Sequence, residues 1–165
     1  MPVIRRLRAD EWRAYRDLRL RALADAPGSF GSTWEQERQR PDGDWAERVA
    51  EGAASQWQLP LVAQEGDALV GLAWGRIDLA EPETARLFQM WVAPEARGRG
   101  CGALMLGAVV DWARKANART LLLSVTVGAT AAERLYAQAG FRPAGELEPL
   151  REGSPLFSQP MRLEL

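Results

Sequence analysis

Glycine and arginine alternate in the segment Arg97-Gly98-Arg99-Gly100-Cys101-Gly102, directly before a stretch with helical periodicity. The first backbone N–H groups of a helix have no intrahelical acceptor, and together with the helix dipole they attract anions. Because glycine has no Cβ, a phosphate group can approach the main chain, and positive φ values are accessible. The pattern therefore predicts a phosphate-binding loop at residues 97–102, to which Arg97 and Arg99 add positive charge and hydrogen-bond donors.

The loop is expected to join a short strand to an amphipathic helix. Residues Leu87–Val92 are mostly apolar and include Phe, Trp and Val, which is typical of a buried strand, and Pro94 ends the strand. From Cys101 onward, apolar residues recur at helical spacing. The predicted buried stripe consists of Cys101, Leu104, Met105, Ala108, Val109 and Trp112. Cys101 is therefore expected to be a packing residue rather than a nucleophile.

This order of strand, loop and helix resembles the acyl-CoA-binding segment of the GNAT superfamily of N-acetyltransferases. The family's R-x-x-G-x-G pattern falls at Arg97, Gly100 and Gly102. The resemblance implies that backbone amides of the loop bind the pyrophosphate of acetyl-CoA. It also implies main-chain contacts with the pantetheine arm and the acetyl group at the end of the preceding strand, at Met90, Trp91 and Val92.

A second match lies at residues 132–141, AERLYAQAGF, which resembles the family's A-x-x-L-Y-x-x-x-G-F motif. The resemblance places Ala132 at the cofactor and assigns Tyr136 as the catalytic residue that donates a proton, or at least a hydrogen bond, to the departing thiolate. A phenol of pKa ~10 suits a thiol of pKa ~8.5 in that role. The alternative is that Tyr136 only packs in the core. Many members also have Asn where this chain has Ala129, so one contact to pantetheine is missing.

Two other interpretations of the loop stay open. Gly98, Gly100 and Ala103 also satisfy the G-x-G-x-x-G/A dinucleotide fingerprint. The next predicted strand, 121–127, ends without the acidic residue that such a fold requires, and only one clear helix follows it. The remaining interpretation is a glycine-rich turn that binds no ligand.

The resemblance implies direct attack of a primary amine on the thioester carbonyl, with a main-chain N–H near residues 90–92 stabilising the oxyanion. Deprotonating an amine of pKa ~10.4 at pH 7 costs about 4.6 kcal/mol, so a base would help. The chain has no histidine. The candidates are Glu35, Glu37, Asp78, Glu81, Glu83, or a water held by the backbone and Gln89. A chain without an effective base would instead be a non-catalytic acyl-CoA sensor.

The acceptor site is predicted from aromatic residues and from position. The GNAT resemblance places the acceptor near the early helical segment and the central strands, although core packing is the alternative use of each aromatic side chain. The candidate substrate residues are Phe30, Trp34, Trp74 and Gln89, with Trp91 on a neighbouring strand. We expect a small-molecule or peptide amine as the substrate.

Composition narrows the class of protein. At 165 residues, the chain is expected to form a single domain, residues 1–165. The net charge of −1 gives no electrostatic case for binding nucleic acid or a membrane surface. One cysteine excludes an internal disulfide, and the lack of histidine removes His-based metal sites and Ser-His triads. No apolar run approaches the ~20 residues of a membrane span. We therefore expect a cytoplasmic, metal-free protein, and a homodimer stays open.

The remaining elements follow from periodicity and turn residues. The first predicted helix is capped by Asp10 and runs to about Asp25, and a second, short helix follows a Ser32 or Thr33 cap. A third spans Trp45–Glu51 after a turn at 41–44. The last begins at a capping box formed by Thr130 and Glu133. Predicted strands are 2–7, 59–63, 68–77, 120–127, 141–147 and 160–165. Gly71 and Gly75 mark either a ligand approach or a twisted strand. The sum fits the GNAT α+β architecture, a mostly antiparallel sheet with a splayed parallel strand pair.

Overall fold

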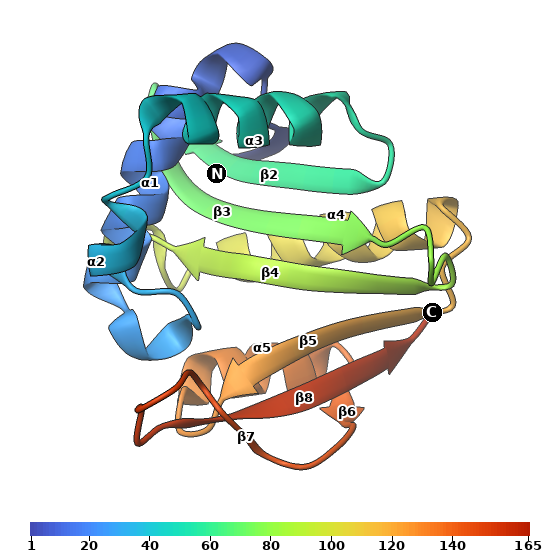
Figure 1. Ribbon diagram of the computed structural model, residues 1–165. Coiled ribbons are helices and arrows are strands. Elements are labelled where there is room, and N and C mark those ends of the chain that lie inside the picture. The colour runs from blue at the N-terminus through green and yellow to red at the C-terminus, as the bar shows by residue number, and fades with distance from the viewer.

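A computed structural model of residues 1–165 contains one eight-stranded sheet with helices on both faces (Figure 1). The strand order is β1-β2-β3-β4-β5-β8-β6, and β7 pairs with β8 off this path. Only β4 and β5 pair in parallel. The strands are β1 Val3–Arg6, β2 Gln58–Glu65, β3 Ala68–Ile77, β4 Thr84–Val92, β5 Thr120–Thr126, β6 Arg142–Pro143, β7 Glu148–Pro149 and β8 Phe157–Glu164. The expected α+β architecture is confirmed.

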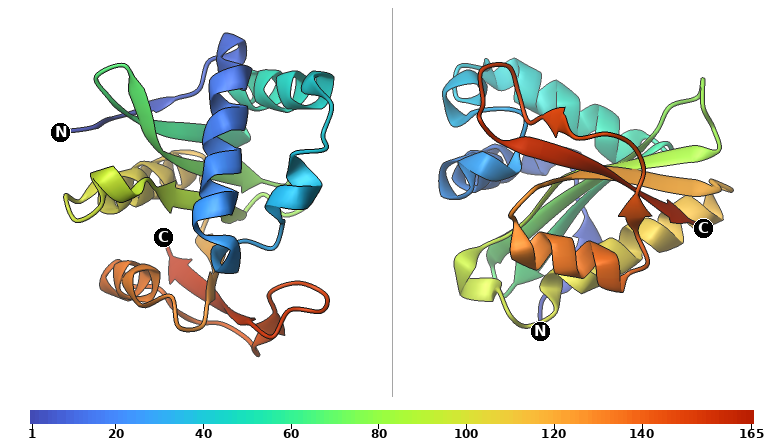
Figure 2. Two further views of the ribbon diagram at one scale, coloured as in Figure 1. Left: turned by 90° about the vertical axis from the view of Figure 1, so that its left-hand side faces the viewer. Right: turned by 90° about the horizontal axis from the view of Figure 1, so that it is seen from below.

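The helices divide between the two faces of the sheet (Figure 2). They are α1 Trp12–Asp25, α2 Trp34–Glu37, α3 Asp42–Ala54, α4 Cys101–Lys115 and α5 Thr130–Gln138, with 3₁₀ turns at Ala9–Glu11, Pro27–Ser29 and Pro94–Ala96. Helices α1 to α3 cover one face, and α4 and α5 cover the other. None of the helices has the length and apolar character that crossing a membrane requires.

Helix α4 begins at Cys101, as predicted, but its buried stripe is rotated from the expected one. Leu104 is 43% exposed, whereas Leu106 and Ala113 are buried. Both sets of positions satisfy the helical period, and the packing of α4 against β2, β3 and β4 selects between them. Cys101 is buried at 2% exposure, and burial raises the pKa of its thiol, so it is a packing residue.

The sheet opens between its two parallel strands. Pairing between β4 and β5 covers only Thr84–Arg86 and Thr120–Leu122, after which the strands diverge (Figure 1). On the other side of β4, Trp74 pairs with Phe88 but Leu72 pairs with Trp91, so β4 carries an extra residue. This β-bulge bends β4 at the point where β5 leaves it.

Two interior glycines of β3 make room for side chains rather than for a ligand. A Cβ at Gly75 would lie 2.9 Å from the ring of Trp112 on α4. A Cβ at Gly71 would lie 3.1 Å from Cε of Met105 and 3.2 Å from the Trp91 carbonyl oxygen. Helix α4 therefore packs close to the sheet at both positions, which excludes the ligand approach that the sequence left open.

Several predicted element boundaries were wrong because local hydrogen bonds differ from the sequence signals. Asp10 lies within a 3₁₀ turn and does not cap α1, and α3 begins at Asp42, inside the predicted turn. Thr130 does not cap α5, because its hydroxyl donates to the Gly128 carbonyl. Glu133 instead accepts from the Gly128 N–H at 2.9 Å.

Other boundaries agree with the prediction. Thr33 caps α2 by accepting from the Gln36 N–H at 3.2 Å, Asn117 takes a positive φ of 64° after α4, and Gly140 takes a φ of 100° after α5. The predicted strand 141–147 shortens to β6, whereas β8 begins three residues earlier than predicted, at Phe157.

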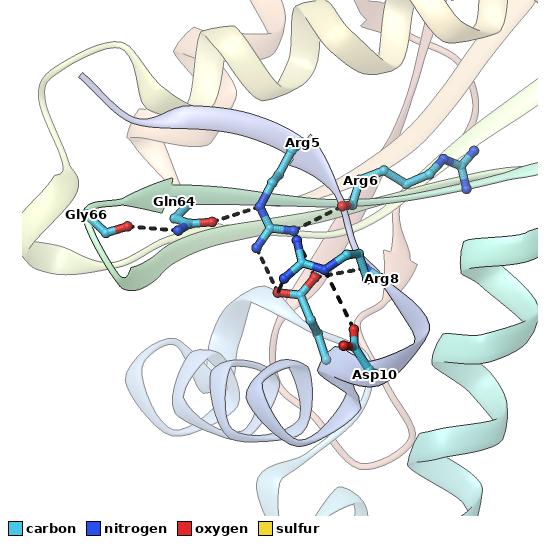
Figure 3. Close-up of polar contacts among 7 residues, drawn as sticks. Arg5, Arg6, Arg8, Asp10, Gln64 and Gly66 are labelled. Atoms are coloured by element: carbon cyan, nitrogen blue, oxygen red, sulfur yellow. Dashed lines mark hydrogen bonds and ion pairs between the residues drawn. The ribbon is translucent and has the colours of Figure 1, made fainter.

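A polar network fixes the amino-terminal strand to the beginning of α1 (Figure 3). The Arg5 guanidinium donates to both carboxylate oxygens of Glu11, at 2.8 and 2.7 Å, and to Gln64 at 2.8 Å. These hydrogen bonds hold the pKa of Glu11 at about 2, well below its usual range. The network supports the β1–β2 edge, far along the sheet from the open strand pair.

Candidate functional site

The glycine-arginine loop has the geometry of an anion-binding turn. Gly98 and Gly100 take positive φ values of 77° and 80°, which residues with a Cβ rarely adopt. A Cβ at either position would meet no atom within 4 Å, so the space over these backbone positions is open. The first hydrogen bond of α4 runs from the Leu104 N–H to the Gly100 carbonyl at 3.0 Å. The amides that precede Leu104 thus have no acceptor within the helix.

The two loop arginines form ion pairs within the chain. Arg97 donates to Asp25 at 2.5 Å and to the Val92 carbonyl at 2.9 Å. Arg99 makes a two-fold contact with Glu65, at 2.8 and 2.7 Å. Both arginines therefore anchor the loop to α1 and β2, and the backbone amides are the groups left to contact an anion.

Trp91 supports the same anchor. Its indole N–H donates to Asp25 at 2.9 Å, and its side chain is 5% exposed. This hydrogen bond, together with the contact from Arg97, lowers the pKa of Asp25. Only the main chain of Trp91 is therefore available for the predicted cofactor contact. Its side chain is buried in the core and lines no acceptor cavity, although the sequence also suggested it for the acceptor site.

The two sequence motifs meet at Gly102. A Cβ added there would lie 3.3 Å from Cδ2 of Leu135 on α5, 3.7 Å from Cε of Met90 and 3.9 Å from Cγ2 of Val92 on β4. The beginning of α4, the end of β4 and the α5 motif therefore converge around one residue without a side chain. Ala132, also on α5, is partly buried against the core.

A cavity of about 820 Å³ lies where β4 and β5 diverge. Three of the four predicted substrate residues line it, namely Phe30, Trp74 and Gln89. Met90 and Tyr136 line it too, so the end of β4 and the α5 motif reach the same space. The fourth predicted residue, Trp34, lines a separate cavity of about 380 Å³.

Tyr136 is 7% exposed, and its ring packs edge-on against Phe141 with centroids 5.7 Å apart. Burial raises the pKa of its phenol to about 12. The hydroxyl therefore stays protonated at neutral pH and can donate a hydrogen bond. Donating the whole proton to a thiolate of pKa ~8.5 would be uphill by about 5 kcal/mol.

The β4 bulge presents Gln89 to the cavity. Gln89 has a φ of 60°, an unusual value for a residue with a Cβ, and its side-chain oxygen accepts a hydrogen bond from the Tyr15 hydroxyl of α1. Tyr15 is 1% exposed, so this contact fixes the bulge to the core. Bulges leave a backbone residue outside the ladder and commonly occur beside active sites.

The sequence model of the acetyltransferase (GNAT) family matches residues 5–141 of the chain. The chain belongs to the GNAT family of acetyltransferases. It is 32% identical over 136 residues to the mycothiol acetyltransferase of Clavibacter sepedonicus, covering 82% of the chain and 40% of that protein. It is 28% identical over 113 residues to the ribosomal protein bS18 alanine N-acetyltransferase of Salmonella typhimurium, covering 68% of the chain and 74% of that protein.

Solved structures share the fold of this GNAT chain. The structure of yncA from Salmonella typhimurium, determined with its cofactor acetyl-CoA, superimposes with a TM-score of 0.81 at 19% identity, over 100% of the chain and 94% of that protein. The chain spans only 25 to 40% of the mycothiol acetyltransferases that it matches.

Among the five carboxylates considered as bases, the fold brings one to the cavity of this GNAT chain. Glu37 lines the cavity, is 4% exposed and pairs with Arg40. Glu35 lines the smaller cavity instead. The others lie outside both cavities, where Glu81 pairs with Arg86 and Glu83 with Arg119.

Sequence reasoning missed the arginines of this cavity. Arg19 lies on the inner side of α1, is 3% exposed and lines the cavity. Arg48 and Arg76 line it as well. The available signal was an arginine on the buried stripe of an amphipathic helix, but twenty arginines in the chain obscured it.

Proposed function

We propose that this protein transfers the acetyl group of acetyl-CoA to the primary amine of a small molecule or peptide, by direct attack of the amine on the thioester. Membership of the GNAT family supports the reaction class. The relatives named above are called acetyltransferases of a small molecule and of a ribosomal protein, and the yncA structure contains acetyl-CoA. Acetyl-CoA supplies an activated acyl group as a thioester.

The observation that carries the proposal is the convergence at Gly102. The open amides at the beginning of α4 can bind a diphosphate, while Met90 and Val92 on β4 lie next to the same residue. Met90 and Tyr136 both line the cavity. A ligand that is anionic at one end and reactive at the other could thus lie along the β4–β5 opening, between the loop and the cavity.

Different residues would hold different parts of acetyl-CoA. The amides of Gly98, Arg99, Gly100, Cys101 and Gly102, with Arg97 positioning the loop, would hold the diphosphate. The main chain of Met90, Trp91 and Val92 would hold the pantetheine arm, since the backbone of β4 facing the opening has no strand partner beyond Arg86. Ala132 would contact the same arm, and Ala129 supplies no side-chain amide, so this arm relies on the backbone.

The chemistry needs stabilisation at two atoms. A backbone N–H at the β4 bulge would donate to the thioester oxygen as negative charge develops, and one such donor is worth about 3 kcal/mol. The Tyr136 hydroxyl would donate to the sulfur. Because burial raises the pKa of Tyr136 to about 12, its role is hydrogen-bond donation rather than complete proton transfer.

The amine must lose a proton before it attacks. Of the five candidate bases, Glu37 is the one that lines the cavity, and Gln89 can hold a water there. Arg40 already pairs with Glu37, so an amine would have to compete with this guanidinium for the carboxylate. A Glu37→Gln variant separates the two routes, with Glu35→Gln on the same helix as the control. A fall of about 10²-fold in the amine-dependent rate for Glu37→Gln alone assigns the base to Glu37. Equal rates exclude Glu37 and leave the water held by the backbone and Gln89 as the candidate base.

The deciding experiment measures release of the CoA thiol from acetyl-CoA with a panel of primary amines. Release that requires an amine, together with an acetylated product identified by mass spectrometry, supports the transferase. The alternative is a non-catalytic acyl-CoA sensor. Tight binding of acetyl-CoA with no amine-dependent release would support the sensor and refute the transferase.

A further inference from the structure

Arg19 is a buried cation without a partner. It lies on α1 with 3% of its surface exposed, and neither its Nε nor its Nη1 makes a hydrogen bond. Its guanidinium carbon lies 4.7 Å from the centroid of the Phe30 ring, a cation–π contact that supplies no hydrogen-bond acceptor to its N–H groups. Burial lowers the pKa of Arg19, but an arginine stays protonated in a protein. An unpaired buried charge of this kind lowers the stability of the fold unless a ligand supplies the opposite charge.

The cavity that Arg19 lines is strongly positive. Five arginines line it against two glutamates, so positive charges exceed negative ones by three. The lining arginines are Arg19, Arg40, Arg48, Arg76 and Arg86, and the glutamates are Glu37 and Glu148. The whole chain has a net charge of −1, so this excess is local and does not reflect overall composition.

Ion pairs neutralise only some of these arginines. Arg40 pairs with Glu37, and Arg86 pairs with Glu81 at 3.4 Å. Arg48 has its guanidinium carbon 5.6 Å from the centroid of the Trp45 ring and makes no ion pair. Arg19, Arg48 and Arg76 therefore have no carboxylate within ion-pair distance, and Arg76 is exposed. Arg19 on α1 and Arg48 on α3 are neighbouring cations. The charge of Glu37 also acts on Arg19, but Glu37 is paired with Arg40.

We propose that Arg19, assisted by Arg48, binds a carboxylate on the acceptor, so that the substrate is an amine of the amino-acid class. A guanidinium presents its N–H groups in a planar fork that matches a carboxylate. The remaining wall includes Phe30, Trp74, Phe88 and Met161, which suits an apolar side chain. This inference rests on the proposed acetyl transfer and narrows it to one substrate class.

The same charges argue against two other kinds of acceptor. A polyamine would bring further positive charge into a cavity that already has an excess of it. The amino terminus of a peptide carries a neutral amide where a free amino acid carries its carboxylate, so it would leave Arg19 unpaired. An amine bearing a phosphate would share the anionic chemistry, and the test must therefore separate a phosphate from a carboxylate.

The test compares amines matched in all but the anionic group. Phenylalanine, phenylalaninamide and 2-phenylethylamine share a side chain, and O-phosphoethanolamine is compared with ethanolamine. We expect kcat/KM for phenylalanine to exceed that for its two uncharged analogues by about 10- to 100-fold, the range of a charge-assisted hydrogen bond. Equal values for the three amines, or a preference for O-phosphoethanolamine with none for phenylalanine, would overturn the carboxylate assignment.

The variant Arg19→Met keeps the length of the side chain and removes its charge. We expect it to bring the ratio of kcat/KM for phenylalanine over 2-phenylethylamine close to one, whereas Arg13→Met, at an exposed position of the same helix, keeps the wild-type ratio. A ratio unchanged in Arg19→Met would overturn the proposal. Should Arg19→Met fail to fold, Arg48→Met provides the same comparison.

A binding measurement separates this inference from the proposed reaction. Thermal stabilisation of the protein by phenylalanine, but not by 2-phenylethylamine, is expected without acetyl-CoA and requires no turnover. Stabilisation by phenylalanine without any acetyl transfer would refute the proposed function and retain the carboxylate site. Transfer to 2-phenylethylamine with no stabilisation by phenylalanine would retain the proposed function and refute the carboxylate site.

Discussion

The substitution Gly100→Ala tests the anion-binding loop with a control in the same chain. Gly100 has a φ of 80° and precedes the first residue of α4, and Gly66 has a φ of 62° in the turn between β2 and β3. A Cβ at either position meets no atom within 4 Å, so alanine introduces only backbone strain in the free protein. A left-handed conformation costs a residue with a Cβ about 1–2 kcal/mol. Both variants should therefore lower Tm by about 2–8 °C.

The two variants should differ once acetyl-CoA is added. A ligand at 100 times its Kd stabilises the folded state by about 2.7 kcal/mol. In Gly100→Ala the new methyl group occupies the space over the loop amides, and a tenfold weaker affinity, about 1.4 kcal/mol, would halve that stabilisation. Gly66→Ala should retain the whole of it. The assay is thermal unfolding over a series of acetyl-CoA concentrations. Equal ligand-induced shifts in Tm for the two variants would refute the assignment of the diphosphate to this loop.

Three further predictions concern the tyrosine, an acid-sensitive ion pair and core packing. Tyr136→Phe should lower kcat by about 10- to 100-fold with little change in acetyl-CoA affinity, since it removes one hydrogen bond to a developing thiolate; an unchanged kcat would exclude the role. Because the pKa of Glu11 is lowered to about 2, its contribution to the free energy of unfolding is present above pH ~4.5 and lost as pH falls toward 2. In Glu11→Gln, the free energy of urea unfolding should therefore change less across that interval, and a pH profile equal to that of the wild type would contradict this. Gly52→Ala places a Cβ 2.5 Å from the Trp74 ring and should lower the free energy of urea unfolding by about 1–3 kcal/mol. Gly43→Ala on the same helix meets no atom within 4 Å and should not destabilise the protein. Equal effects of the two substitutions would refute the packing argument.

The loop and its helix were predictable because their signals are local. The glycines of the loop predicted positive φ values, and Gly98 and Gly100 take such values. The beginning of α4 at Cys101 and the cap at Thr33 depend on residues within one turn of each other. Signals of this kind depend on residues close in sequence, and here the tertiary packing agrees with them.

The errors occurred where packing or a competing hydrogen bond decides. Helical spacing admits either Leu104 or Leu106 on the buried side of α4, and only the sheet selects Leu106. The Thr130 and Glu133 pair matches a capping box in sequence, yet both side chains bond to Gly128 instead. Short strands such as β6, with two residues, depend on the partner strand β8 and carry little signal of their own.

The acceptor side was the least predictable part of the site. Phe30, Trp74 and Gln89 come from three separate segments, and the fold brings them to one cavity. Trp34 had the same local signal as Phe30 but lines another cavity. Arg19 is buried without a partner, which a sequence cannot reveal because an unpaired charge is defined by what surrounds it.

The most direct test of the account is amine-dependent release of CoA thiol, measured with the wild-type protein and with Gly100→Ala. Release should require both acetyl-CoA and a primary amine, and the variant should need a higher acetyl-CoA concentration for the same rate. A wild-type protein that binds acetyl-CoA and releases no thiol with any amine would contradict it.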